Sequence, residues 1–249
     1  YRVRMRTKAY HAFEQKIIYF DDDIALIDVL RESVLKGDLT DAGSKFVLKN
    51  IDPIKHEHLK RRKNSEGSRK LLINHLRQTV YSSYVKDLYE EVTHYLRAIL
   101  EKSAENGFDA GRIIGEHSTK LDAKAILAIG NWESVAKLIA DSVFQALEAE
   151  KSTLKLFEKI SNKLALGIDN NLIEAALPYL EVRHYLVHAD GKAPDDFKHK
   201  HPGIPIKDGY FQLSYTFVSN LKNTTKALIK AYDEAVVAAN LLKAADLQP

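Results

Sequence analysis

Apolar residues recur every three or four positions along most of this chain, a period typical of amphipathic α-helices rather than strands. The predicted helices of the first two thirds cover residues 7–36, 68–104, 119–129, 131–149 and 151–166. Polar residues that are suited to cap these helices stand near their starts, namely Ser68, Ser118 or Thr119, Asn131 and Ser152. The hydrophobic pattern therefore predicts an all-α protein.

One later stretch with helical periodicity, residues 172–187, contains a proline, Pro178. Because proline has no N–H to donate, it disrupts a helix interior but suits the first helical turn. We therefore expect a new helix over about 177–189, with Pro178 in its first turn, rather than one continuous helix.

The segment that follows, residues 190–212, is rich in glycine and proline, which predicts an irregular connection. A short strand or hairpin is expected near 204–213, and a last helix over about 214–245. The complete pattern predicts a helical bundle of about seven or eight helices, built as a single all-α domain over residues 1–249.

The composition is that of an ordinary globular protein, with 45% hydrophobic and 29% charged residues. The absence of cysteine excludes disulfides and thiolate metal sites. No apolar run approaches the roughly 18–20 residues that span a bilayer, and no apolar signal-peptide core follows the basic N-terminus. These features predict a cytoplasmic protein with no membrane partner.

The net charge of +3 is compatible with nucleic acid but does not select it, so the local clustering of charge matters more. The densest basic run contains Arg61, Arg62 and Lys63, which are predicted to contact RNA phosphates; the alternative is a solvated surface loop. Lys192, Lys198 and Lys200 of the irregular segment are predicted RNA contacts as well.

Two pairs of histidines, His56 with His58 and His199 with His201, suggest metal ligation only weakly, because both lie in polar connectors without cysteine. We expect them to be solvated. The sequence also contains neither a GxGxxG motif nor a phosphate-binding P-loop. We therefore predict a site without a metal or another cofactor.

Arg183 and His188 stand near the predicted end of a helix and carry the most informative chemistry. Apolar residues lie between them and hold the helix against a core, and Ala189-Asp190-Gly191 follows as a break, so a ligand can reach His188. A histidine transfers protons near neutral pH, and an arginine offers a fork of donors to a phosphate. These residue types therefore favour chemistry on a phosphodiester.

The arginine–histidine spacing alone does not identify this pair. The same spacing, within a residue or two, occurs at Arg4–His11, Arg6–His11, Arg69–His75 and Arg112–His117. The alternative for Arg183 and His188 is a structural role, in which Arg183 pairs with Glu181 or another carboxylate and His188 only ends a helix.

The segment Glu181-Val-Arg183-His184-Tyr-Leu-Val-His188-Ala-Asp-Gly resembles the motif of HEPN domains, all-α bundles whose motif is an arginine, a polar residue, a few further residues and a histidine. The order of elements also resembles that of HEPN domains, over about residues 68–245. On this view residues 1–67 are an N-terminal helical extension and a basic connector.

The resemblance implies a metal-independent endoribonuclease that acts as a homodimer, in which two copies of the motif meet. Many such proteins are toxins or act in phage defence, which implies an antitoxin or defence-system partner. Arg183 and His188 would then be catalytic, with His184 assisting and Glu181 supporting. The sequence departs from the family at His184, where asparagine is usual. The alternative function is a non-catalytic HEPN-like module that binds RNA, a nucleotide or a protein.

Overall fold

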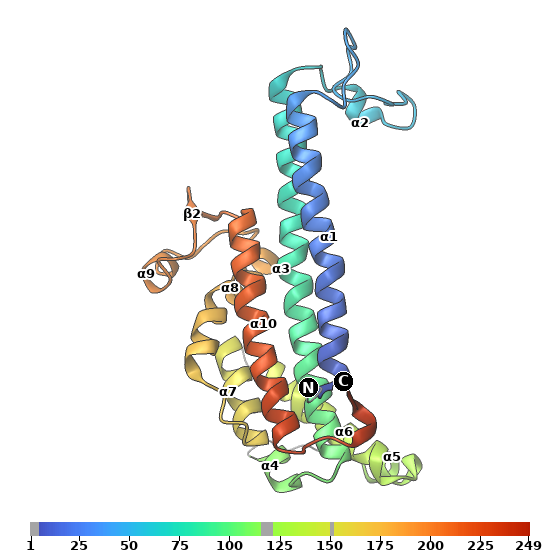
Figure 1. Cartoon of the computed structure of the whole chain (residues 1–249), viewed down its shortest axis with the longest axis vertical. Helices are drawn as coiled ribbons and strands as arrows, with labels where there is room; N and C mark the ends of the chain where they lie inside the picture. The colour runs from blue at the N-terminus through green and yellow to red at the C-terminus, as the bar shows by residue number, and fades with distance from the viewer. Residues whose placement is uncertain (1–4, 116–121, 150–151) are drawn as a thin grey trace.

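A computed structural model of the chain describes residues 5–115, 122–149 and 152–249, and this part is mostly helical (Figure 1). Its α-helices are α1 (Lys8–Lys36), α2 (Glu57–Lys60), α3 (Glu66–Glu105), α4 (Ala110–Ile114), α5 (Ala123–Ile129), α6 (Trp132–Glu148), α7 (Thr153–Leu164), α8 (Asn170–His188), α9 (Phe197–Lys200) and α10 (Tyr215–Ala238). The all-α prediction is confirmed. The expected count of seven or eight helices is too low, because α2, α4 and α9 are too short to produce a periodic pattern.

A long hairpin of α1 and α3 runs the length of the molecule and projects beyond the other helices (Figure 1). Thr7 caps α1 by accepting a hydrogen bond from the Tyr10 N–H, and Gly37 ends the helix with a left-handed φ of 86°. Ile17 and Ile27 of α1 and Tyr81 of α3 are buried in the shared core, and the ring of Phe20 on α1 lies 5.9 Å from that of Tyr84 on α3. The free half of the hairpin carries the loop with α2 at its tip.

The C-terminal half of α3 is the centre of the core, and α6, α8 and α10 pack against it. Leu88, Leu96, Ile99 and Leu100 of α3 are fully buried there. Because α8 packs against both α3 and α10, its position is fixed from two sides. This packing is what places the C-terminal end of α8, and the Arg183–His188 motif with it.

Helix α8 is continuous from Asn170 to His188, so the prediction of a new helix at about 177 is wrong. Pro178 lies inside it, where the missing N–H and the proline ring disfavour a helix. The buried residues Ile173 and Ala176 before the proline, and Leu180 after it, fix the chain on both sides. Tertiary packing therefore outweighs the local preference for a break.

Helix α10 ends at Ala238, earlier than the predicted 245. The chain turns at Asn240, which has a φ of 52°, and then buries Leu241 and Leu242. After a short 3-10 helix at Ala244–Asp246, strand β4 (Leu247–Gln248) pairs antiparallel with β1 (Arg6–Thr7). The two ends of the described chain therefore lie side by side (Figure 1).

Asp233 on α10 fastens this junction from within the core. Its carboxylate accepts hydrogen bonds from the Thr7 hydroxyl at 2.6 Å, the Thr7 N–H at 3.2 Å and the Tyr95 hydroxyl at 3.2 Å. Burial raises the pKa of Asp233 although these hydrogen bonds oppose the shift. A buried carboxylate is retained here because its donors replace the lost water.

The predicted caps are confirmed for Asn131 and Ser152, which accept hydrogen bonds from the N–H groups of Ser134 and Lys155. Ser65 rather than Ser68 caps α3, because the Ser65 backbone is extended and its hydroxyl accepts from the Ser68 N–H. Ser118 and Thr119 lie outside the described residues. Within the described ranges, no helix is both long and apolar enough to cross a bilayer.

Candidate functional site

The motif occupies the C-terminal half of α8, and the helix ends as the sequence predicts, at His188. The N–H groups of Ala189 and Gly191 both donate to the Tyr185 carbonyl, at 3.0 and 2.9 Å. Asp190 and Gly191 adopt left-handed conformations with φ of 51° and 77°. This turn closes the helix and directs residues 190–212 back across its end.

An aromatic cluster of Tyr185, Phe197 and Phe211 fixes that returning segment to α8. The Phe197 ring lies 5.5 Å from that of Tyr185 and 5.0 Å from that of Phe211, both edge-on. Phe211 belongs to the predicted hairpin, which the structure forms from β2 (Ile206–Lys207) and β3 (Tyr210–Phe211). The cluster thereby holds α9, and the residues after it, beside the motif.

A cleft of about 860 Å³ opens where α8, α3, the 194–201 segment and the residues that flank the α6–α7 connection meet. Every motif residue that the sequence predicts to be functional lines it. They are Glu181, Arg183, His184 and His188. Lys200 and His201 line the same cleft from the opposite wall. The structure therefore brings the motif and part of the basic segment together.

The guanidinium of Arg183 lies 5.0 Å above the ring of Tyr89, which α3 supplies. Its Nε is buried and makes no hydrogen bond to a described residue. The structural alternative pairs Arg183 with Glu181 or another carboxylate, but within the described chain Arg183 forms no such ion pair, and Glu181 contacts His201 instead. Arg183 is thus held by an aromatic ring and keeps its positive charge for a ligand of the cleft.

Glu181, His184 and His188 lie on one face of α8, because they are spaced by three and four residues. The rings of His184 and His188 are 4.9 Å apart, and both side chains are exposed. Arg183 precedes His188 by five residues, which places it about 7.5 Å back along the axis and about 140° around it. The two imidazoles therefore share one face of α8, and the Arg183 side chain reaches the same cleft from another side of the helix.

Glu181 contacts a histidine from the other wall. Its Oε2 lies 3.5 Å from Nε2 of His201, whose side chain is 21% exposed. Nearby, Lys200 donates to Asp196, and this hydrogen bond raises the pKa of Lys200 and lowers that of Asp196. Burial, followed by the charge of Glu181, raises the pKa of Tyr185. Asp196 thus has a cationic partner of its own, whereas Glu181 lies against His201.

The other predicted RNA contacts lie elsewhere. Arg61, Arg62 and Lys63 are at the tip of the α1–α3 hairpin, far from α8 (Figure 1), and Arg61 forms an exposed ion pair with Glu57. Lys192 and Lys198 are exposed on the irregular segment but do not line the cleft. Of the six predicted lysine and arginine contacts, only Lys200 joins the motif.

The competing arginine–histidine pairs are not assembled in the same way. Arg69 donates to the Asn64 side chain at 2.8 Å, whereas His75 lines a separate hollow of about 660 Å³. Arg112 donates to a backbone carbonyl, and His117 lies outside the described residues.

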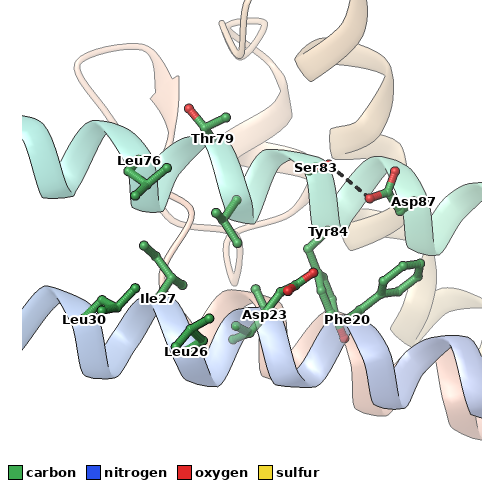
Figure 2. A pocket seen from close by; sticks show the side chains of 12 residues that line it. Phe20, Asp23, Leu26, Ile27, Leu30, Leu76, Thr79, Ser83, Tyr84 and Asp87 are labelled. Atoms are coloured by element: carbon green, nitrogen blue, oxygen red, sulfur yellow. Dashed lines mark hydrogen bonds between the residues drawn. The ribbon is translucent and has the colours of Figure 1, made fainter. Parts of the chain in front are cut away.

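A further hollow, of about 430 Å³, lies between α1 and α3 on the projecting hairpin (Figure 2). Leu26, Ile27 and Leu30 face Leu76 across it. Its polar lining residues are acidic or hydroxylic, including Asp87, which accepts a hydrogen bond from Ser83 at 3.0 Å. Among its lining residues there is no cation, so it is unsuited to a phosphate.

Two residues of the α8 cleft were not predicted to be functional. Tyr89 lies about a hundred residues before the motif on another helix, and nothing in the sequence links them. The sequence suggests His201 only as half of a weak metal pair, although its proximity to the motif along the chain is a usable signal. No protein-family model, curated protein or solved structure matches this chain.

Proposed function

We propose that this chain is a metal-independent endoribonuclease of the HEPN type. The observation that supports the proposal best is the shared cleft, in which Arg183, His184 and His188 stand together. Arg183 adds a charge that no described carboxylate neutralises. Arg183 together with the exposed imidazoles of His184 and His188 suits an RNA phosphodiester, whose cleavage requires proton transfer and charge stabilisation.

The reaction uses the 2′-hydroxyl of the RNA as the nucleophile. His188 accepts the proton of that hydroxyl as the 2′-oxygen bonds to phosphorus. The bond from phosphorus to the 5′-oxygen breaks, and the departing oxygen takes a proton from a second group. Arg183, with His184, stabilises the negative charge on the phosphoryl oxygens. The products are a 2′,3′-cyclic phosphate and a 5′-hydroxyl.

On the basis of the resemblance to HEPN domains, the proposal also includes a biological role and a homodimeric assembly. We assign the chain a toxin or phage-defence role, with an antitoxin or defence-system partner that controls it. Two protomers would face each other at the motif. Val187 next to the cleft is an apolar side chain that is 43% exposed, which suits such a contact.

Cleavage of RNA in the presence of EDTA tests the proposal. Purified protein is expected to cut RNA under these conditions and to leave cyclic phosphate ends. His188→Ala is expected to lower the rate by about 10²–10⁴-fold, the usual contribution of a proton-transfer group. His94→Ala is the matched control, because the His94 side chain is 64% exposed on α3 and does not line the cleft. Cleavage that survives His188→Ala would overturn the assignment.

The alternative function is a non-catalytic binding module, and the same experiment distinguishes it. If the chain only binds RNA, the wild-type protein should retain RNA in a filter or gel-shift assay without cutting it, and its expression should not be toxic. Arg183→Ala would then weaken binding, since the arginine is the cleft cation with no anionic partner among the described residues.

A further inference from the structure

We propose that His201 is a second catalytic residue of the cleft, the proton donor to the departing 5′-oxygen, and that Glu181 positions it. This inference rests on the proposed function. It differs from the assembly that the HEPN resemblance implies, because one protomer then contains both groups that transfer protons. The observations behind it are the contact between Glu181 and His201 and the shared cleft.

The arrangement along α8 suits a phosphodiester that lies between two histidines. Glu181 and His188 are seven residues apart, so they lie on nearly the same face and about 10.5 Å apart along the axis. His201 meets the helix at Glu181, and His184 lies between the two ends on the same face. Arg183 reaches the same cleft from about 140° around the axis. His201 and His188, at the two ends of this face, therefore suit a displacement in which the oxygen that attacks and the oxygen that leaves lie on opposite sides of phosphorus.

His201 is held as firmly as a catalytic side chain requires. Its ring lies 4.8 Å from that of Phe197, which is buried in the aromatic cluster. The backbone N–H of His201 donates to the Phe197 carbonyl at 2.8 Å. Glu181 contacts one ring nitrogen, which leaves the other for substrate. The neighbouring cation, Lys200, is already paired with Asp196 and does not compete for Glu181.

The reaction needs one group that accepts the 2′-hydroxyl proton and one that donates a proton to the 5′-oxygen, and the surroundings of His188 and His201 assign these roles. A carboxylate beside an imidazole orients the ring and stabilises its protonated form, as in other carboxylate–histidine pairs. His201 has such a carboxylate, whereas no described carboxylate forms an ion pair with His188. His188 therefore accepts the 2′-hydroxyl proton and His201 donates one to the 5′-oxygen. After product release, His188 loses a proton to water and His201 regains one, so the pair is reset.

A modified RNA tests the role of His201 directly. The cleavage site is first mapped with wild-type protein, and the RNA is then made with sulfur in place of the bridging 5′-oxygen there. A thiolate leaves without help from an acid. His201→Ala is expected to slow cleavage of ordinary RNA by about 10²–10⁴-fold but to cut the sulfur-bridged RNA at nearly the wild-type rate. His188→Ala should slow both. His199→Ala, an exposed neighbour, is the matched control.

Glu181→Gln tests the positioning role with the same pair of substrates. It should slow cleavage of ordinary RNA and spare the sulfur-bridged RNA, which a general structural defect would not do. If His201→Ala fails to fold, as judged by circular dichroism, His201→Gln keeps the side-chain size and serves instead. A His201 variant that cuts ordinary RNA within about threefold of the wild-type rate, or slows equally on both substrates, overturns the inference.

Mixing two inactive variants shows whether the two histidines belong to one protomer. Protein with His188→Ala is combined with protein carrying His201→Ala, and the chains are allowed to exchange. No activity should return, because each cleft still lacks one group. Activity restored by mixing would show that the histidines come from different protomers and would overturn the inference. If the wild-type protein itself does not cut RNA in EDTA, the proposed function fails, and this inference fails with it.

Discussion

Phe197→Ala is expected to detach the 190–212 segment from α8 and to cost about 3–5 kcal/mol in the free energy of unfolding. The ring is 3% exposed and is the only aromatic side chain of the described residues that contacts Tyr185, Phe211 and His201 together. Alanine would remove the ring and leave a cavity between the segment and the helix. The loss would be a large part of the roughly 5–15 kcal/mol that holds a domain folded.

Urea unfolding followed by circular dichroism measures the loss, and hydrogen exchange shows where the chain opens. Exchange should rise across residues 190–212, and RNA cleavage should fall with it because His201 moves. Phe197→Leu keeps most of the apolar volume and should cost about 1–2 kcal/mol. Lys198→Ala, an exposed neighbour, should cost at most about 0.5 kcal/mol. A loss below about 1 kcal/mol for Phe197→Ala, with unchanged exchange, would refute the role of the cluster.

Two further predictions concern the site and the pH dependence of stability. Tyr89→Leu removes the ring beneath Arg183, a contact worth about 0.5–2 kcal/mol, so RNA cleavage should fall by about two- to thirtyfold. Tyr89→Phe keeps the ring and should retain the rate, and equal losses in both variants would contradict the stacking role. Burial, followed by a hydrogen bond with Asp141, raises the pKa of Glu101 from 4.5 to about 7. Because the folded state holds this proton more tightly, the group's contribution to stability is complete below the unfolded pKa and is lost as the pH rises through about 7. Urea unfolding measures the free energy of unfolding at about pH 5 and at about pH 8, and the difference between the two values should be smaller for Glu101→Gln than for wild type. An identical difference in both proteins would contradict the raised pKa of Glu101.

The long helices were predictable because each one buries a face of its own sequence. The hydrophobic period located α1, α3, α6, α7 and α10 to within a few residues at most ends, and it predicted the β2–β3 hairpin. The pairing of β1 with β4 was not predictable in this way. It joins two-residue segments from opposite ends of the chain, and neither segment is long enough to carry a pattern.

Pro178 shows where local reasoning fails. A proline inside a helix is unfavourable by itself, so the sequence alone favours a break at about 177. The helix continues because residues on both sides of the proline are buried against α3 and α10. Contacts between elements outweigh a local cost of this size, and a single sequence does not reveal them.

The candidate site was predictable on α8 but not beyond it. Arg183, His184 and His188 belong to one helix, so the apolar residues between them, the helix end and the resemblance of the segment to the HEPN motif were enough to group them. Tyr89 and His201 reach the same cleft from α3 and from the irregular segment, and only the tertiary arrangement shows this. The basic run at Arg61 illustrates the converse, because this strong local charge follows α2 at the hairpin tip, far from α8 (Figure 1), and none of its residues lines the cleft.

The most direct test of this account is the cleavage of RNA by purified protein in EDTA, with wild type, His188→Ala and His94→Ala compared at equal concentration. We expect cyclic phosphate ends from the wild type and from His94→Ala, and a rate at least about a hundredfold lower for His188→Ala. Equal cleavage by all three proteins, or cleavage by none, would contradict it.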